Sequence, residues 1–147
     1  MKLIVLAADS AQMSADGKLH ALGLGTIAYP TPTPPMSLIV MVEFEASDTA
    51  REGVSLVGEL RSQQSGEQLT LGDDGETVGF DEALDGIKGR GRGRATALFN
   101  FNGGMPVEPG GYYWHVRIRG TDLVEEVPVR FLEQSHDQEE STGEQDA

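Results

Sequence analysis

The sequence alternates apolar and polar residues with a period of two in several separate segments. The clearest segment is SLIVMVEFE at 37–45, and the pattern returns in YYWHVRIR at 112–119 and in VEEVPVRFLE at 124–133. Successive side chains of a β-strand point to opposite faces, so this period predicts strands with one buried face. The side chains expected to point inward in the last two segments are Tyr112, Trp114, Val116, Ile118, Val127, Val129 and Phe131.

Strand signals are frequent along the chain, whereas helix signals are scarce. About eight apolar or alternating segments follow one another at a spacing of roughly ten residues. This organisation predicts an all-β fold, namely an antiparallel β-sandwich of immunoglobulin-like or jelly-roll-like type. The remaining expected strands are 2–8, 18–28, 54–61, 67–71 and 94–101, and the proline-rich segment YPTPTPPMS at 29–37 is expected to be an extended connector outside the sheets.

Two segments depart from the strand pattern. Residues 72–94 are rich in glycine and charge, and we expect a long irregular loop there, with at most one short strand around 77–80. Residues 134–147 contain no Val, Ile, Leu, Met, Phe, Tyr or Trp, and they carry five acids but no Lys or Arg. Such a segment has nothing to bury, so we expect a disordered acidic tail after a single domain spanning 1–133.

The composition of the chain disfavours several classes of function. The formal net charge is -13, which repels phosphate groups and therefore disfavours nucleic acid and anionic membranes as partners. No apolar run approaches the length of a membrane helix. The absence of cysteine excludes disulfides and thiolate metal sites, and it is compatible with a cytoplasmic location. The three histidines, His20, His115 and His136, have no ligand pattern around them, so neither a metal nor a cofactor is expected.

The segment KGRGRGR, which carries Lys88, Arg90, Arg92 and Arg94, stands out in an acidic chain. One interpretation is a flexible arm of the arginine-glycine kind that follows the backbone of an RNA strand. No aromatic residue is interleaved with these cations, which weakens that interpretation. The alternative, which we favour, is a loop whose cations balance the acids just upstream, within one subunit or between subunits.

The N-terminal stretch LAADSAQMSADGKLHALGLG predicts a strand followed by a tight turn. Asp9 falls where the first strand ends, and Asp16 and Gly17 supply the residues of the turn that follows. We expect the Asp9 carboxylate to accept backbone N–H groups in this connection. A catalytic or metal-binding Asp9 is the sharper alternative.

The same stretch resembles the beginning of a bacterial family of uncharacterised proteins. Members of that family open with an alanine-aspartate pair after a strand, followed by a DGKL turn, a glycine-containing strand and a proline-bearing connector. The ending PGGYYWHVRIRGTDLVEEVPVRF is similar to the closing hairpin of the family, although Ser10 stands where members usually have an aromatic residue. The resemblance implies a small β-sandwich and no particular activity. The matching positions are Ala8, Asp9, Ala11, Asp16, Gly17, Lys18, Leu19 and Gly23.

Candidate contact residues on the outward faces indicate a binding protein. Ile39, Met41 and Val57 lie on nominally polar faces, which suggests a second covered apolar face. Tyr113 is the aromatic residue expected at the surface. No catalytic motif is found, so we expect a non-enzymatic binding or assembly module, whose partner is another protein or a second copy of the chain. The alternatives are a carboxylate-based hydrolase or lyase and a nucleic-acid contact through the Arg/Gly loop.

Overall fold

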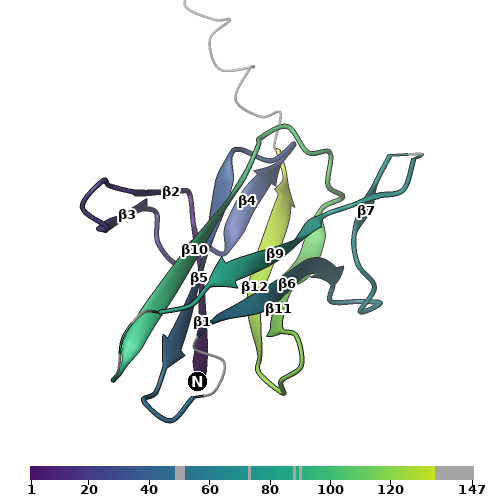
Figure 1. The fold of residues 1–147 in the computed structure, drawn as a ribbon. Helices are drawn as coiled ribbons and strands as arrows, with labels where there is room; N and C mark the ends of the chain where they lie inside the picture. Colours follow the sequence, from purple (N-terminus) through teal and green to yellow (C-terminus); the bar gives the residue numbers. More distant parts are fainter. Residues whose placement is uncertain (49–51, 73, 88, 90, 135–147) are drawn as a thin grey trace, which may run out of the picture.

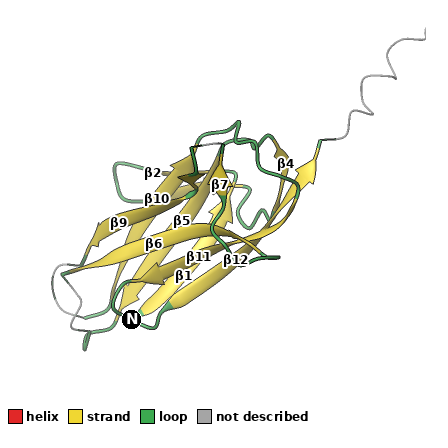
Figure 2. Cartoon of the chain, turned by 90° about the vertical axis from the view of Figure 1, so that its right-hand side faces the viewer, coloured by secondary structure: helices red, strands yellow, loops and turns green. Residues whose placement is uncertain are grey.

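The fold is a β-sandwich of two sheets, seen in a computed structural model that describes residues 1–48, 52–72, 74–87, 89 and 91–134 (Figure 1). The smaller sheet has the order β1-β5-β10, and the larger sheet has the order β4-β12-β11-β6-β9. Over the described residues the chain contains strands and loops but no helix (Figure 2). The predicted all-β class is therefore confirmed.

The strands of the smaller sheet are β1 (Lys2–Ala8), β5 (Met36–Phe44) and β10 (Gly93–Phe101). The strands of the larger sheet are β4 (Ala28–Thr31), β12 (Val124–Glu133), β11 (Gly110–Ile118), β6 (Gly53–Ser62) and β9 (Gly79–Asp85). Two hairpins stand outside the sheets, formed by β2 (Ser10–Met13) with β3 (Leu19–Leu22) and by β7 (Thr70–Leu71) with β8 (Glu76–Thr77). These hairpins project from opposite sides of the sandwich in Figure 1.

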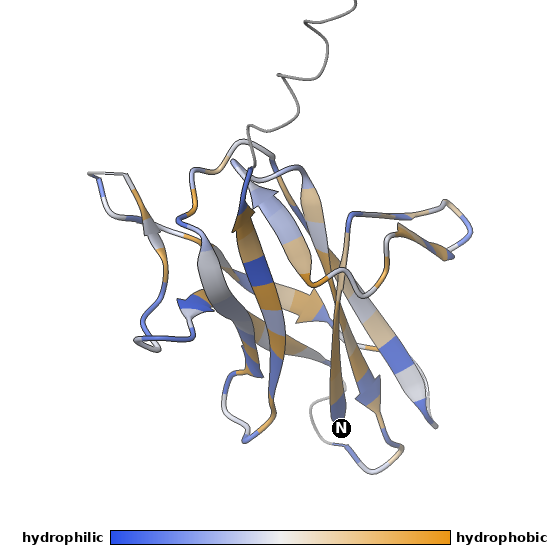
Figure 3. Cartoon of the chain, turned by 180° about the vertical axis from the view of Figure 1, so that it is seen from behind, coloured by the Kyte–Doolittle hydropathy of each residue, from blue (hydrophilic) through white to orange (hydrophobic). Residues whose placement is uncertain are grey.

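The core lies between the two sheets and is built from the inward half of each alternating strand. β5 occupies the middle of the smaller sheet, paired with both β1 and β10, and its side chains are the most completely buried. Figure 3 shows β1, beside the N label, hydrophobic along most of its length. The prediction for β11 is confirmed, because Tyr112, Trp114, Val116 and Ile118 are all buried in this core. On β12, Val129 and Phe131 are buried and Val127 packs partly against the core.

The segment 72–94 is more regular than the sequence predicts, which corrects the expectation of a long irregular loop. Residues Gly79–Asp85 form β9, which pairs along its whole length with β6. An edge strand needs only one partner and can keep polar side chains on its solvent face, so it lacks the apolar alternation of a central strand. Only Phe80 and Leu84 of this strand pack on the core. Two sparse apolar positions were too weak a signal to identify a strand of seven residues.

The stretch 18–37 also differs from the prediction. The expected strand at 18–28 ends at Leu22, and Gly23 and Gly25 then adopt positive φ values of 63° and 83°. The proline-rich connector is not wholly outside the sheets, because β4 pairs in parallel with β12. Pro30 fits there because an edge strand can leave one side without N–H donors.

Pro128 sits on a stretch of β12 whose only ladder partner among the described residues is β11, since the pairing with β4 begins at Arg130. The edge position that the sequence predicts for Pro128 therefore holds locally, although β12 as a whole is not an outer strand.

Candidate functional site

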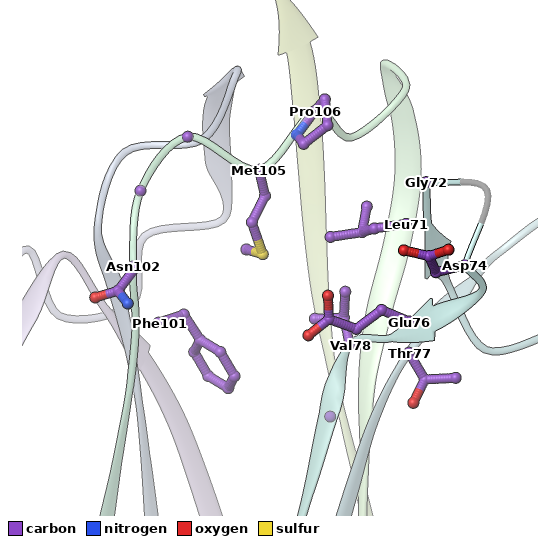
Figure 4. A pocket seen from close by; sticks show the side chains of 13 residues that line it. Leu71, Gly72, Asp74, Glu76, Thr77, Val78, Phe101, Asn102, Met105 and Pro106 are labelled. Atoms are coloured by element: carbon purple, nitrogen blue, oxygen red, sulfur yellow. The ribbon is translucent and has the colours of Figure 1, made fainter.

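A cleft of about 560 Å³ opens where β10 ends, between the β7–β8 hairpin and the segment that runs from Phe101 to Pro106 (Figure 4). The side chains of Asp74 and Glu76 point into it from the hairpin, and Phe101 and Met105 face them from the other wall. Apolar side chains form much of the lining, with Asn102 as a further polar group. The complete lining is Leu71, Gly72, Asp74, Glu76, Thr77, Val78, Gly79, Phe101, Asn102, Gly103, Gly104, Met105 and Pro106.

Contacts with the core and with the segment before β5 fix the Phe101 wall of the cleft. The ring of Phe101 stacks on Trp114 in the core, with centroids 4.9 Å apart. The N–H of Thr33 donates to the carbonyl of Met105 at 3.1 Å, and the N–H of Met105 donates to the hydroxyl of Thr33 at 3.2 Å. Gly103 packs so closely on Pro35 that a Cβ there would lie 2.9 Å from the proline ring. This wall is therefore held by the core and by the segment that precedes β5.

The sandwich has four outer strands, and three of them carry features that discourage pairing with another chain. β4 is four residues long and contains Pro30. β9 carries Asp81, Glu82 and Asp85, and Glu82 lies opposite Leu56, on the inward side. Charges, prolines and short length are the usual protections of a sheet edge.

β1 is apolar, but its neighbours cover its free edge. The carbonyl of Ala7 accepts a hydrogen bond from the N–H of Gly25 at 2.7 Å, and the carbonyl of Ala8 accepts one from the Tyr29 hydroxyl at 3.3 Å. β12 lies beside the same strand. These contacts occupy groups that another chain would need for pairing.

β10 is the outer strand that lacks a proline, an acid and, among the described residues, a ladder partner at its free edge, although β9 lies near part of it and the Phe80 ring stacks on Phe99. Its residues 95–101, ATALFNF, carry no charge and no proline, and among the described residues the strand forms a ladder with β5 alone. Ala97, Leu98, Phe99 and Phe101 are only half-buried. A strand of this kind presents a row of unpaired N–H and C=O groups to any chain that can align with it.

The described arginines of the KGRGRGR segment pair with Glu43 on β5 and with Glu45, which follows this strand. Arg94 forms an ion pair with Glu43, and the Nε atom of Arg92 lies 2.9 Å from Glu45. The Arg94 guanidinium holds the pKa of the Glu43 carboxyl below its ordinary value, chiefly through their hydrogen bond. Asp81, one of the upstream acids expected to balance these cations, instead pairs with Arg119. Lys88 and Arg90 lie outside the described residues, as does Asp73.

Tyr113 lies on the outer face of the larger sheet, within a polar network. Arg61 binds the Glu59 carboxylate with its Nη2 atom at 2.7 Å, and this bond, together with a weaker one to Tyr113, raises the pKa of the guanidinium. His115 follows on the same face, with its Nδ1 atom 3.3 Å from Glu126. The network makes this face polar, and its components already satisfy one another.

Ile39, Met41 and Val57 do not form one apolar face, which corrects the sequence interpretation. Ile39 and Met41 lie on β5 in the smaller sheet, whereas Val57 lies on β6 in the larger one. Ile39 is fully buried and Val57 is nearly so. Ile39 has Leu6 and Leu98 as its cross-strand neighbours in the smaller sheet, and β2 contacts both β5 and β10.

The turn residues lie where the sequence predicts them. Gly17 adopts a φ of 81° and donates its N–H to the carbonyl of Ser14 at 2.9 Å. The Ser14 hydroxyl donates to Asp16 and lowers the pKa of that carboxyl. Asp9 lies between β1 and β2, but its carboxylate packs against Gly23, and the expected backbone hydrogen bonds to it are not seen among the described residues.

Apolar side chains are also exposed near the β2–β3 hairpin. Of the six large hydrophobic residues that the described chain exposes, four fall between residues 13 and 27, namely Met13, Leu22, Leu24 and Ile27. These side chains form a group of exposed apolar residues separate from the β10 edge.

Comparisons of the sequence with protein-family models and with curated proteins find no match. The resemblance to a bacterial family therefore stays a prediction. In the part of the chain that the structure describes, no group of three or more His, Asp or Glu side chains is arranged to hold a metal ion. No helix that could cross a membrane occurs among the same residues.

Sequence reasoning identified neither the cleft nor the free edge of β10. The uncharged run ATALFNF was visible, but its meaning depends on which strands end up at the edges. The cleft joins Asp74 and Glu76 to residues about thirty positions later in the chain, Phe101 and Met105, and no local pattern connects them.

Proposed function

We propose that this chain is a non-enzymatic assembly module that associates with a second copy of itself in the cytoplasm. The observation that carries the proposal is the contrast between the unprotected edge of β10 and the protected edges of β1, β4 and β9. Edges left open in soluble proteins invite pairing with another chain, so natural sequences usually block them. The cysteine-free sequence is compatible with that compartment.

The charge of the chain favours β10 as the contact region. With a formal net charge of -13, two copies repel each other, and an interface between them is more stable if it excludes acids. Pairing β9 with its own copy would gather Asp81, Glu82 and Asp85 of both copies along one seam. The last seven residues of β10, 95–101, bring no charge to the seam.

The test is the mass in solution as a function of protein concentration, measured by light scattering coupled to size exclusion. We expect the mass to rise from the 15.8 kDa of one chain toward twice that value. The association should persist at high salt, because backbone pairing and apolar burial are screened far less than exposed ion pairs. A single-chain mass at every concentration and salt would contradict the proposal.

A second candidate function is carboxylate-based hydrolysis in the cleft, and one observation favours it. Asp74 and Glu76 face an apolar wall across the cavity, the kind of lining that small-molecule sites have (Figure 4). The test is hydrolysis of a panel of nitrophenyl glycosides and esters by the parent and by Glu76→Gln. Glu67→Gln, in an exposed turn, is the matched control. Turnover that Glu76→Gln abolishes and Glu67→Gln keeps would favour the hydrolase.

A further inference from the structure

We infer that two copies join by antiparallel pairing of β10 with β10, about a two-fold axis at Ala97. This inference rests on the proposed function and specifies its interface. The pairing would join the two three-stranded sheets into one continuous sheet. Because the same patch serves both copies, the assembly closes as a dimer.

The register follows from the length of the strand and the direction of its side chains. Directly opposed residues of an antiparallel pair point to the same face, so inward residues must meet inward residues. Ala97 is the midpoint of Gly93–Phe101, and a two-fold axis there pairs all nine residues. A register shifted by two positions would still set inward residues against inward residues, but it would leave residues of β10 unpaired at both ends.

This register sets small side chains against large ones on the inward face. Ala95 comes opposite Phe99 of the second copy, and Gly93 comes opposite its Phe101. Ala97 meets Ala97 at the axis. On the outward face, Thr96 comes opposite Leu98. Alternation of small and large residues lets the rings extend over the seam without overlap.

Burial within one copy indicates the same seam. Ala97, Phe99 and Phe101 pack on the core, yet each remains half-buried, because β10 forms a ladder with β5 alone among the described residues and the Phe80 ring of β9 covers only part of Phe99. The equivalent inward residues of β5, which has neighbours on both sides, are fully buried. A second copy of β10 would bury these side chains more completely, as the neighbours of β5 bury its inward side chains.

Charges do not oppose this pairing at the ends of β10. The register places Arg92 opposite Asn102 of the second copy, on the outward face with Thr96 and Leu98. Arg94 comes opposite Asn100, so each of these cations meets an amide and not a second cation.

A single introduced cysteine tests the geometry, because the chain has none of its own. Ala97→Cys places two thiols at the axis, and Ala83→Cys on β9 is the matched control on another outer strand. With a short bis-maleimide, we expect a covalent dimer from Ala97→Cys at dilutions where Ala83→Cys stays a single chain. Equal yields from the two variants would overturn the inference.

A charge placed on the edge gives a second measurement. Thr96→Lys puts a cation on the outward face of the seam, whereas Ala83→Lys makes a lysine on β9. We expect Thr96→Lys to raise the dissociation constant by more than about tenfold and Ala83→Lys to leave it unchanged. Circular dichroism and melting curves check that both variants fold.

The outcomes separate the inference from the proposed function. A parent that dimerises, with Thr96→Lys still a dimer and no preferential cross-linking at Ala97, would overturn the β10 pairing and leave self-association intact. A parent that stays a single chain at every concentration would overturn both.

Discussion

The ring of Phe80 on β9 lies nearly parallel to the ring of Phe99 on β10, with the centroids 3.7 Å apart and the planes 11° apart. The two strands belong to different sheets, so this stack links the outer strands across the sandwich. Gly58 on β6 makes room for it, because a Cβ at that position would lie 2.2 Å from the Phe80 ring. The absence of a side chain at Gly58 therefore has a packing role.

Gly58→Ala should destabilise the fold by about 1–3 kcal/mol, because the added methyl overlaps the Phe80 ring. The measurement is the free energy of unfolding in urea. In a Phe80→Ala background the same change should cost much less, since the clashing ring is gone. Equal costs of Gly58→Ala in the two backgrounds would show that the ring is not the cause.

Trp114→Ala should cost about 3–5 kcal/mol, because this buried indole is 3 % exposed and stacks on Phe101. Thermal unfolding followed by circular dichroism measures the loss. Arg130→Ala, at an exposed position of the neighbouring β12, is the control and should stay within about 0.5 kcal/mol of the parent. A near-neutral Trp114→Ala would contradict the core role of this residue.

Gly17→Ala should cost about 1–2 kcal/mol, since Gly17 has a φ of 81° that a Cβ disfavours. Nothing lies within 4 Å of the added Cβ, so the cost would come from the backbone alone. Gly17→Asn should recover part of the loss, because asparagine tolerates the left-handed region. Urea unfolding measures the loss of stability in both variants. Equal losses for Gly17→Ala and Gly17→Asn would argue against the backbone conformation as the cause.

Stability should fall as the pH rises from 10 to about 12. Burial, and to a lesser degree the charge of Asp9, raises the pKa of Tyr29 from 10.0 to about 12. The unfolded chain therefore loses this proton first, and ionisation pulls the equilibrium toward unfolding throughout that interval. Burial also raises the pKa of Tyr112, which adds to the same trend.

The variant that checks this pH dependence is Tyr29→Phe. Its stability should fall less steeply as the pH rises, and the smaller decline that remains would come from Tyr112. Urea midpoints below pH 10 and near pH 12 give the comparison, with Tyr113→Phe as a control on the polar outer face. A parent whose midpoint does not change between these conditions would refute the assignment.

The alternation of apolar residues was enough to predict the class of fold and much of the core. In β11 the same period that makes a strand also selects its buried face, so Trp114 and Val116 were identified from spacing alone. The turn at Gly17 was predictable for a similar reason, since an Asp-Gly pair has a local conformational preference. In each case the information lies within a few residues.

The sequence by itself therefore determined the class of fold, the inward faces of the alternating strands and the turn between β2 and β3. Only the tertiary structure decided that β10 lies at an edge, that Ile39 and Val57 belong to different sheets, and that Asp74 and Glu76 share a cleft with Phe101. The physical reason is that a period-two pattern depends on the local geometry of the backbone. The order of strands depends on which distant segments pair, and a pattern confined to one strand contains no record of its neighbours.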